Sequence, residues 1–152
     1  MVKGSIKVFI EIPKGDDRRR HLSRDKKRML DFGPMKNLVP VNNGREPMAY
    51  GFIIGTKSQK DGDELDVLVY SKRGFRIGES VNATPIAMLM RGNEDHKVIA
   101  VDGTTRRNIK KWSDVPKTER DLLVRFLSYT TTIKSIKGAK ATISYIDKNK
   151  IK

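Results

Sequence analysis

The sequence predicts a mainly β domain, a small barrel with one helix packed on it. Short segments rich in β-branched and aromatic residues recur along the chain between glycine and proline turns, and one stretch in the C-terminal half shows helical spacing. The 152 residues suffice for one core, and 37% hydrophobic against 33% charged residues is a globular balance. We therefore expect residues 1–152 to form a single α+β domain in which strands dominate.

The first strand is predicted over residues 6–12 and ends at the turn Pro13-Lys14-Gly15. Residues 14–36 follow with nine basic side chains against four acidic ones and few core-forming residues, which indicates an exposed hairpin or loop. The remaining strands are expected at residues 50–54, 65–70, 81–90, 97–102 and 141–146.

One helix is predicted, over residues 115–129. Its apolar residues, such as Leu122 and Phe126, recur at helical spacing. Asp114 is the expected N-cap, and Pro116 suits the first turn.

The chain is strongly basic, with a formal net charge of +14 from 32 Lys and Arg against 18 Asp and Glu. Besides residues 14–36, the C-terminal segment 130–152 carries six lysines against one aspartate. Nucleic acid or another polyanion is therefore a candidate partner, and a solvated basic surface is the alternative explanation.

The absence of cysteine excludes disulfides and thiolate metal sites. No apolar run approaches the roughly 20 residues that span a bilayer. Residues 1–11 contain a strand-like stretch and no signal-peptide pattern. We expect a cytoplasmic protein without a membrane partner.

Negative charge is concentrated in one segment, where Asp61, Asp63, Glu64 and Asp66 precede the apolar run 67–69. Converging carboxylates repel one another, and a hard divalent cation such as Mg²⁺, Mn²⁺ or Ca²⁺ would relieve that repulsion. For D-G-D alone, a solvated acidic turn is the better explanation. Asp66 interrupts an apolar strand, however, and an unpaired charge there is unfavourable, which favours a metal site.

Two further carboxylates are candidates for the same chemistry. Glu11 lies inside the first strand, and Asp95 lies just before Lys97 at the start of another. The structural alternatives are an outward-facing strand position for Glu11 and a surface ion pair for Asp95 and Lys97.

Four blocks, in this order and spacing, resemble the family I soluble inorganic pyrophosphatases, and the D-x-D-x-x-D-V pattern in the third block (61–67) is the specific signature. They are I-E-I-P-K-G (10–15), Y-G-F-I (50–53), D-G-D-E-L-D-V-L-V (61–69) and E-D-H-K-V-I-A-V (94–101). The resemblance covers about residues 3–129. It implies a five-stranded OB-like barrel with a helix, an active site in the barrel mouth and a homo-oligomer. It also implies hydrolysis of pyrophosphate to two phosphates with Mg²⁺, or alternatively Mn²⁺.

The resemblance also implies roles for individual residues. Asp61, Asp66 and Asp95 correspond to ligands of a metal pair that holds the attacking water, and Asp63 to the carboxylate that takes the proton of this water. Glu11 corresponds to a ligand of an outer metal, directly or through water. The residues implied in contacts with phosphate, and in orienting the water, are Tyr50, Lys97, Tyr129 and one of the pair Arg19 and Arg20.

The chain departs from the family pattern at several of these positions. A family glutamate is replaced by His21 or Leu22, and a metal-binding aspartate by Met90, whose thioether does not substitute for carboxylate on a hard cation. The lysine that follows the tyrosine is Thr130 here. A family arginine before Tyr50 has no clear counterpart, with Lys36 and Arg45 as candidates.

Three functions are therefore considered. The first is an active, divergent pyrophosphatase, weakened by the loss of the ligand at Met90. The second is a catalytically impaired homologue that serves as a basic structural or RNA-binding protein. The third is a phosphohydrolase for a larger anion such as a nucleotide or polyphosphate. Retention of the water-activating carboxylates favours the first.

Overall fold

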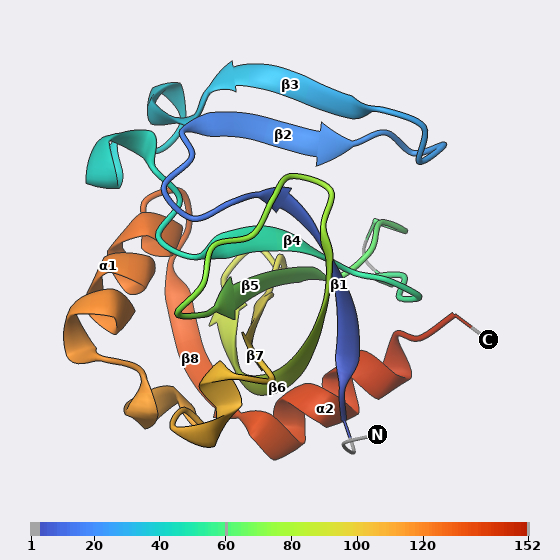
Figure 1. Cartoon of the computed structure of the whole chain (residues 1–152), viewed down its shortest axis with the longest axis vertical. Coiled ribbons are helices and arrows are strands. Elements are labelled where there is room, and N and C mark those ends of the chain that lie inside the picture. Colours follow the sequence, from blue (N-terminus) through green and yellow to red (C-terminus); the bar gives the residue numbers. More distant parts are fainter. Residues whose placement is uncertain (1–3, 60, 152) are drawn as a thin grey trace.

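A computed structural model describes residues 4–59 and 61–151. Its centre is a barrel of five strands (Figure 1), in the order β1 (Ile6–Ile12), β4 (Ala49–Ile53), β5 (Asp66–Tyr70), β7 (Lys97–Asp102) and β6 (Ser80–Arg91). Pairing of β6 with β1 closes the barrel. β5 and β7 run parallel, whereas the other neighbours are antiparallel. The predicted fold class is confirmed.

Further strands and helices lie around the barrel. β2 (Arg18–Leu22) and β3 (Met29–Pro34) form a separate hairpin, so the basic segment 14–36 folds over one side of the barrel. β8 (Ile133–Gly138) pairs with β6 outside the closed ring. The two helices are α1 (Lys117–Ser128) and α2 (Ala139–Lys148), which lie on different sides of the barrel in Figure 1.

Alternation along the strands produces two separate hydrophobic clusters. One contains side chains from all five barrel strands, including Val8, Val67 and Val98, and fills the interior, with Ile146 of α2 packed against it. The other contains Leu68, Ile99 and their neighbours together with the buried face of α1. Residues that share a face with Leu68 or Ile99 therefore point outward, toward the space beside α1.

The C-terminal segment differs from the prediction. Residues 141–146, expected as a strand, lie in α2, and β8 was not expected. β-branched residues such as Thr142 and Ile143 favour a strand locally, but Thr142 and Ile146 are buried at i, i+4 spacing on one helical face. Packing against the barrel therefore overrides local propensity. No helix in the described ranges is long and apolar enough to cross a bilayer.

The predicted N-cap of the first helix is wrong. Asp114 ends a short 3-10 turn, and its carboxylate accepts hydrogen bonds from the backbone N–H groups of Lys110 and Lys111 (3.0 and 3.2 Å). Pro116 occupies the N-cap position of α1, where no side chain caps the helix. Pro116 has no N–H and a restricted φ, so it is compatible with this boundary.

Candidate active site

Parallel pairing of β5 and β7 brings Asp66 beside Lys97. Val67 pairs with Val98, and each of the two polar residues directly precedes one member of this pair. Because alternate side chains share a face, Asp66 points to the side of Leu68, and Lys97 to the side of Ile99. Both side chains therefore lie on the outer face of the barrel, at the end where β5 and β7 begin.

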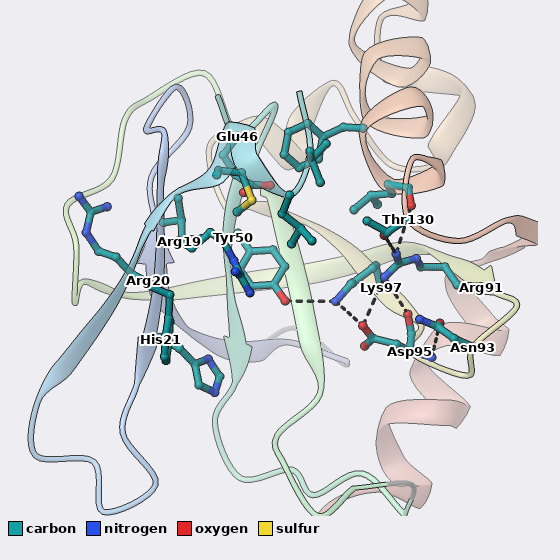
Figure 2. A pocket seen from close by; sticks show the side chains of 17 residues that line it. Arg19, Arg20, His21, Glu46, Tyr50, Arg91, Asn93, Asp95, Lys97 and Thr130 are labelled. Atoms are coloured by element: carbon teal, nitrogen blue, oxygen red, sulfur yellow. Dashed lines mark hydrogen bonds and ion pairs between the residues drawn. The ribbon is translucent and has the colours of Figure 1, made fainter. Parts of the chain in front are cut away.

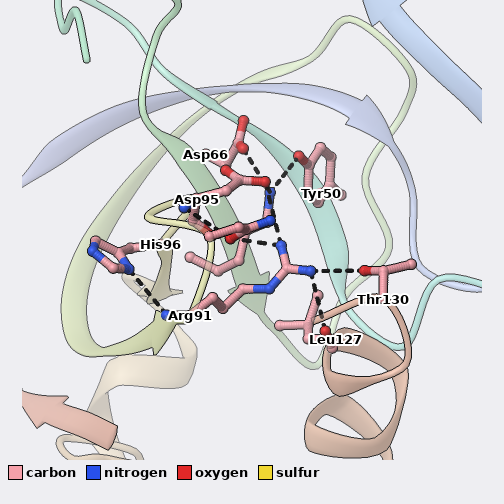
Figure 3. A network of polar contacts seen from close by, with 9 residues as sticks. Tyr50, Asp66, Arg91, Asp95, His96, Leu127 and Thr130 are labelled. Atoms are coloured by element: carbon pink, nitrogen blue, oxygen red, sulfur yellow. Dashed lines mark hydrogen bonds and ion pairs between the residues drawn. The ribbon is translucent and has the colours of Figure 1, made fainter. Parts of the chain in front are cut away.

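The Lys97 ammonium connects three side chains, which Figure 3 labels as Tyr50, Asp66 and Asp95. Its Nζ donates hydrogen bonds to Asp66 Oδ2 (2.6 Å), Asp95 Oδ2 (3.1 Å) and the hydroxyl oxygen of Tyr50 (3.1 Å). Only 6% of the Lys97 side chain is exposed, so these bonds replace nearly all of its hydration. Asp95 and Lys97 therefore do not form the surface ion pair that was the structural alternative, because they belong to a largely buried network.

Burial and charged neighbours shift the pKa values of Asp66 and Asp95 in opposite directions. Burial raises the pKa of Asp66 to about 6, although Lys97 acts against the rise. Burial alone would also raise the pKa of Asp95, but Lys97 and hydrogen bonding with Asp66 hold it below its ordinary value. The pKa of Lys97 is raised, because its neighbours Tyr50, Asp66 and Asp95 outweigh burial. Lys97 is thus a fixed positive charge at neutral pH.

Tyr50 is positioned by the Y-G-F-I block. A Cβ on Gly51 would lie 1.8 Å from the carbonyl oxygen of Phe9 on the adjacent strand, so only glycine allows β1 and β4 to approach this closely. Burial, followed by the charge of Asp66, raises the pKa of Tyr50 well above that of a free phenol. The hydroxyl therefore keeps its proton, and while it accepts from Lys97 it still has one O–H to donate.

The acidic segment forms a turn beside this network. Gly62 has φ +77°, a conformation that favours glycine, and the backbone N–H of Asp63 donates to Asp61 Oδ1 (3.0 Å). Asp63 Oδ1 lies 3.2 Å from Arg24 Nη2, and Glu64 pairs with Lys26, both from the loop that joins β2 and β3. The turn and the network enclose a cavity of about 240 Å³, here called the carboxylate cavity, lined by Asp61, Asp63, Glu64, Asp66 and Asp95 among others.

Glu11 does not line this cavity. It is fully buried beneath the β2–β3 hairpin, where its Oε2 accepts from the backbone N–H of Leu22 (2.7 Å) and lies 2.9 Å from His21 Nδ1. Its Oε1 is buried without a hydrogen-bond partner. The Glu11 carboxylate raises the pKa of His21, which itself lines the carboxylate cavity.

A second cavity, of about 470 Å³, adjoins the first, and we call it the apolar–basic cavity (Figure 2). Arg19 points into it toward Tyr50 and makes no hydrogen bond or ion pair with the described part of the chain. Arg20 also lines it but is held by Asp16 (2.7 Å) and turns away from Tyr50 in this view. Tyr129, predicted to contact phosphate, is 56% exposed at the end of α1 and lines neither cavity.

Arg91 and Glu46 line the apolar–basic cavity and were not predicted. Arg91 is buried and donates to Asp95 Oδ2 (3.3 Å), Thr130 Oγ1 (2.9 Å) and the carbonyl oxygen of Leu127 (3.2 Å). A guanidinium thus lies next to Thr130, where the family pattern has a lysine. The sequence offers one indication, since Arg91 stands four residues before Asp95, but Glu46 belongs to no pattern.

Other residues discussed from the sequence have structural roles. Met90 is partly buried, pairs with Ser135 of β8 and packs against the interior core cluster. Arg45 Nη1 donates to the carbonyl oxygen of Gly15 (3.0 Å), and neither Arg45 nor Lys36 lines the two cavities. Neither candidate therefore replaces the family arginine at the site.

The carboxylate oxygens that line the carboxylate cavity are of the kind that binds a divalent metal ion. Within residues 4–59 and 61–151, no three acidic or histidine side chains gather closely enough to hold an ion as they stand, because Lys97 occupies the space between Asp66 and Asp95. Nevertheless, four aspartates line one small cavity, and hard oxygen donors of this kind suit Mg²⁺, Mn²⁺ and Ca²⁺. Asp66 has a raised pKa, and Glu11 has an unpartnered Oε1. A nearby cation would lower the free-energy cost of burying negative charge on these two carboxyl groups.

The fold is that of crystallised inorganic pyrophosphatases. The structure from Ehrlichia chaffeensis superposes with a TM-score of 0.86 at 26% identity, covering 98% of this chain and 95% of that one. The inorganic pyrophosphatase of Saccharolobus solfataricus is 32% identical over 147 residues, 89% of this chain and 79% of its own. That of Sulfolobus acidocaldarius is 31% identical over 132 residues, 82% and 72% of the two chains.

The family model described as inorganic pyrophosphatase matches residues 8–151. The chain therefore belongs to the inorganic pyrophosphatase family, and a divalent metal is the cofactor that this family implies. Membership agrees with the resemblance seen in the sequence blocks.

Glu46 provides a test of the electrostatics at this site. It is 2% exposed, and burial raises its pKa from 4.5 to about 8, with Lys97 acting against the rise. Between these two pH values the folded state holds a proton that the unfolded state has lost, so this group lowers the free energy of unfolding as pH rises. Glu46→Gln should therefore become progressively more stable relative to the parent, by up to about 1.4 kcal/mol per pH unit. Urea denaturation at pH 5, 6.5 and 8 measures this difference.

The matched control is Glu119→Gln, which removes a carboxylate that lies outside both cavities, 3.7 Å from Lys14 Nζ. We expect only a small difference from the parent, without a trend between pH 5 and 8. A difference for Glu46→Gln that stays constant with pH would show that Glu46 ionises normally in the folded protein.

Proposed function

We propose that the chain hydrolyses inorganic pyrophosphate to two phosphates in the cytoplasm, with Mg²⁺ as its cofactor and Mn²⁺ as an alternative. One observation carries the proposal: Asp66 and Asp95 converge on the buried ammonium of Lys97 at the wall of a cavity rich in carboxylates. The family of the chain supports the same reaction.

The carboxylates of Asp61, Asp66 and Asp95 would hold the divalent ions, with Glu11 contributing to an outer ion from beneath the hairpin. When bound, such ions lower the pKa of water and neutralise phosphate oxygens. Since Glu11 lies outside the carboxylate cavity, its contribution through a water molecule is favoured over direct contact.

Asp63 is the proposed acceptor of the proton lost by the attacking water. It lines the carboxylate cavity and is partly exposed, so the proton can pass on to solvent. The hydrogen bond from its backbone N–H to Asp61 Oδ1 fixes the turn, and its ion pair with Arg24 holds the side chain at the wall of the cavity.

The phosphate groups would be held by Lys97, Tyr50 and Arg19. Lys97 and Tyr50 line both cavities, one as a cation and the other as a neutral donor. Arg19 is the better candidate of the arginine pair, because Asp16 already neutralises Arg20. Positive charge of this kind stabilises the charge that develops on a transferring phosphoryl group. Tyr129 would contribute only if it moved, since it now faces solvent.

The wider surface suits an anionic substrate. A formal net charge of +14 attracts pyrophosphate, and it also leaves nucleic acid or another polyanion as a candidate partner. Assembly into a homo-oligomer is proposed by analogy with the family alone.

The proposal is tested by phosphate release from pyrophosphate with Mg²⁺ or Mn²⁺. We expect turnover that stops when EDTA removes the metal and returns when Mg²⁺ is added in excess. Absence of turnover with either metal, in a folded preparation, would contradict the proposal and favour the polyanion-binding alternative. That alternative predicts co-purifying nucleic acid whose binding weakens steeply with salt.

A further inference from the structure

Unpaired positive charge gathers at the end of the barrel opposite the carboxylate cavity. β5 and β7 run parallel, begin at Asp66 and Lys97, and end at Tyr70 and Asp102. At about 3.3 Å per residue, the far ends of these strands lie roughly 15 Å from the lysine network. The two loops that follow them, residues 71–79 and 103–111, are here called the far loops.

The far loops carry seven basic side chains and one acidic one. The basic residues of the first loop are Lys72, Arg73 and Arg76. Those of the second are Arg106, Arg107, Lys110 and Lys111. All are exposed except the half-buried Arg106. Within residues 4–59 and 61–151, only Arg73 of this set makes an ion pair, with Glu79 (2.6 Å). Six positive charges therefore have no acidic partner there.

The basic hairpin differs, because much of its charge is neutralised. Residues 14–36 carry nine basic side chains, and five of them make ion pairs, for example Arg18 with Asp31 and Arg24 with Asp63. A count of basic residues alone favours residues 14–36 and 130–152 as the anion-binding segments. Pairing in the folded chain instead leaves more of the charge at the far loops available to a ligand.

The far loops and the start of β6 line a groove of about 500 Å³. Arg73 and Arg107 both line it, together with exposed polar side chains that can donate hydrogen bonds, Ser80, Asn82 and Thr104. One lining residue is acidic, Asp102, which is 5% exposed and accepts at Oδ1 from the backbone N–H of Thr105 (3.3 Å). The groove thus offers two guanidinium groups and neutral donors, and its carboxylate is buried.

Backbone hydrogen bonds fix the far loops in place. The N–H of Lys72 donates to Thr105 Oγ1 (3.2 Å), which joins one loop to the other. Within the first loop, the N–H of Arg76 donates to Glu79 Oε1 (3.0 Å). The basic side chains therefore project from a preformed surface, and a ligand would not have to order it.

We propose that the far loops bind the sugar–phosphate backbone of a double-stranded nucleic acid. Guanidinium groups bind phosphate oxygens in pairs, and basic side chains without acidic partners displace the counterions of the polyanion. A single strand requires exposed aromatic side chains for its bases to stack on, whereas Phe75 is buried and Trp112 is half-buried. Duplex bases are already stacked on one another. A flat anionic bilayer would meet the rim of the groove, whereas a phosphodiester backbone is narrow enough to enter it.

Binding at this surface would specify the polyanion partner named under the proposed function, and it involves no residue that lines the carboxylate cavity or the apolar–basic cavity. The lysine network lies at the other ends of β5 and β7. Pyrophosphate turnover should therefore be the same with and without saturating duplex. This separates duplex binding from the proposed hydrolysis.

Fluorescence anisotropy of labelled DNA and RNA duplexes between 50 and 200 mM NaCl tests the proposal. With four to six phosphate contacts, log K should fall against log salt with a slope of about −4 to −5. Arg107→Gln combined with Lys110→Gln removes two unpaired charges. This variant should reduce the slope by about 2 and weaken binding roughly tenfold or more at 100 mM NaCl. Arg76→Gln, in the other loop, should reduce the slope by about 1.

The matched control is Lys27→Gln combined with Arg28→Gln. It removes the same two charges from exposed positions in the loop that joins β2 and β3, where neither side chain makes an ion pair with the described residues. The slope should stay that of the parent. Circular dichroism checks that each variant is folded.

The outcomes are distinct for the two proposals. Duplex binding that the far-loop variants weaken and the control does not supports the inference, even in a preparation that fails to hydrolyse pyrophosphate, a failure that would overturn the proposed hydrolysis alone. No duplex binding, or equal losses in the far-loop variant and the control, overturns the inference alone. Tighter binding of a single strand or of phosphatidylserine vesicles assigns the surface to those ligands and overturns it too. Inhibition of pyrophosphate turnover by the duplex would locate binding at the cavities, with the same consequence.

Discussion

Asp66→Asn should reduce pyrophosphate hydrolysis roughly 100-fold or more while the protein stays folded. The amide keeps the shape of the carboxylate but removes a negative oxygen from the proposed metal-binding set. Metal ions contribute several kcal/mol to such reactions, and each 1.36 kcal/mol is a factor of ten in rate. Because burial already disfavours the charge of Asp66, its removal should not unfold the protein. Phosphate release at saturating Mg²⁺ measures the loss.

Two further measurements make this result decisive. Mn²⁺ binding by calorimetry should weaken in Asp66→Asn, whereas a purely structural role would leave it unchanged. Asp121→Asn is the control, since Asp121 is an exposed partner of Lys117 on α1 (2.6 Å) and lies outside both cavities. Activity of Asp66→Asn close to that of the parent, with normal circular dichroism, would remove Asp66 from the catalytic set.

Lys97→Met should lower the free energy of unfolding by about 3 kcal/mol in metal-free buffer, the effect of breaking a buried ion pair by removing one partner. Methionine fills a similar volume but leaves Asp66 and Asp95 without their shared cation. The pKa of Lys97 is raised, so its stabilisation is fully present below the ordinary lysine pKa and is therefore complete at pH 7. Denaturation in urea with EDTA measures it.

Addition of Mg²⁺ or Mn²⁺ should return part of this stability, because the ion replaces the missing positive charge between the two carboxylates. The control is Lys117→Met, whose ammonium makes an exposed i, i+4 pair and should contribute no more than about 0.5 kcal/mol. Equal losses for the two variants, or a loss at Lys97 that metal leaves untouched, would contradict the proposed link between the lysine network and the metal site.

Much of the barrel and part of the site follow from local sequence. The strands at residues 6–12, 50–54, 65–70, 81–90 and 97–102 carry apolar residues at the spacing that a barrel wall requires, and the structure contains all of them. The turn at Gly62 and the close approach at Gly51 also lie within short motifs. These features depend on residues that are close in the sequence. The four sequence blocks were therefore enough to indicate the family.

The burial and pairing of the charged side chains could not be predicted from the sequence and became visible only in the tertiary structure. Lys97 reaches Tyr50 across 47 residues of sequence, and Arg91 reaches Thr130 across 39. The sequence likewise gave no reason to single out Glu46 or to expect a helix at residues 139–148.

The sequence by itself thus determined the strands of the barrel and the acidic residues available for chemistry. The tertiary structure decided which of those residues share a cavity and which are neutralised. The physical reason is that side-chain periodicity is a local property, whereas the free energy of a charge depends on the solvent and the partners that distant segments take away or supply.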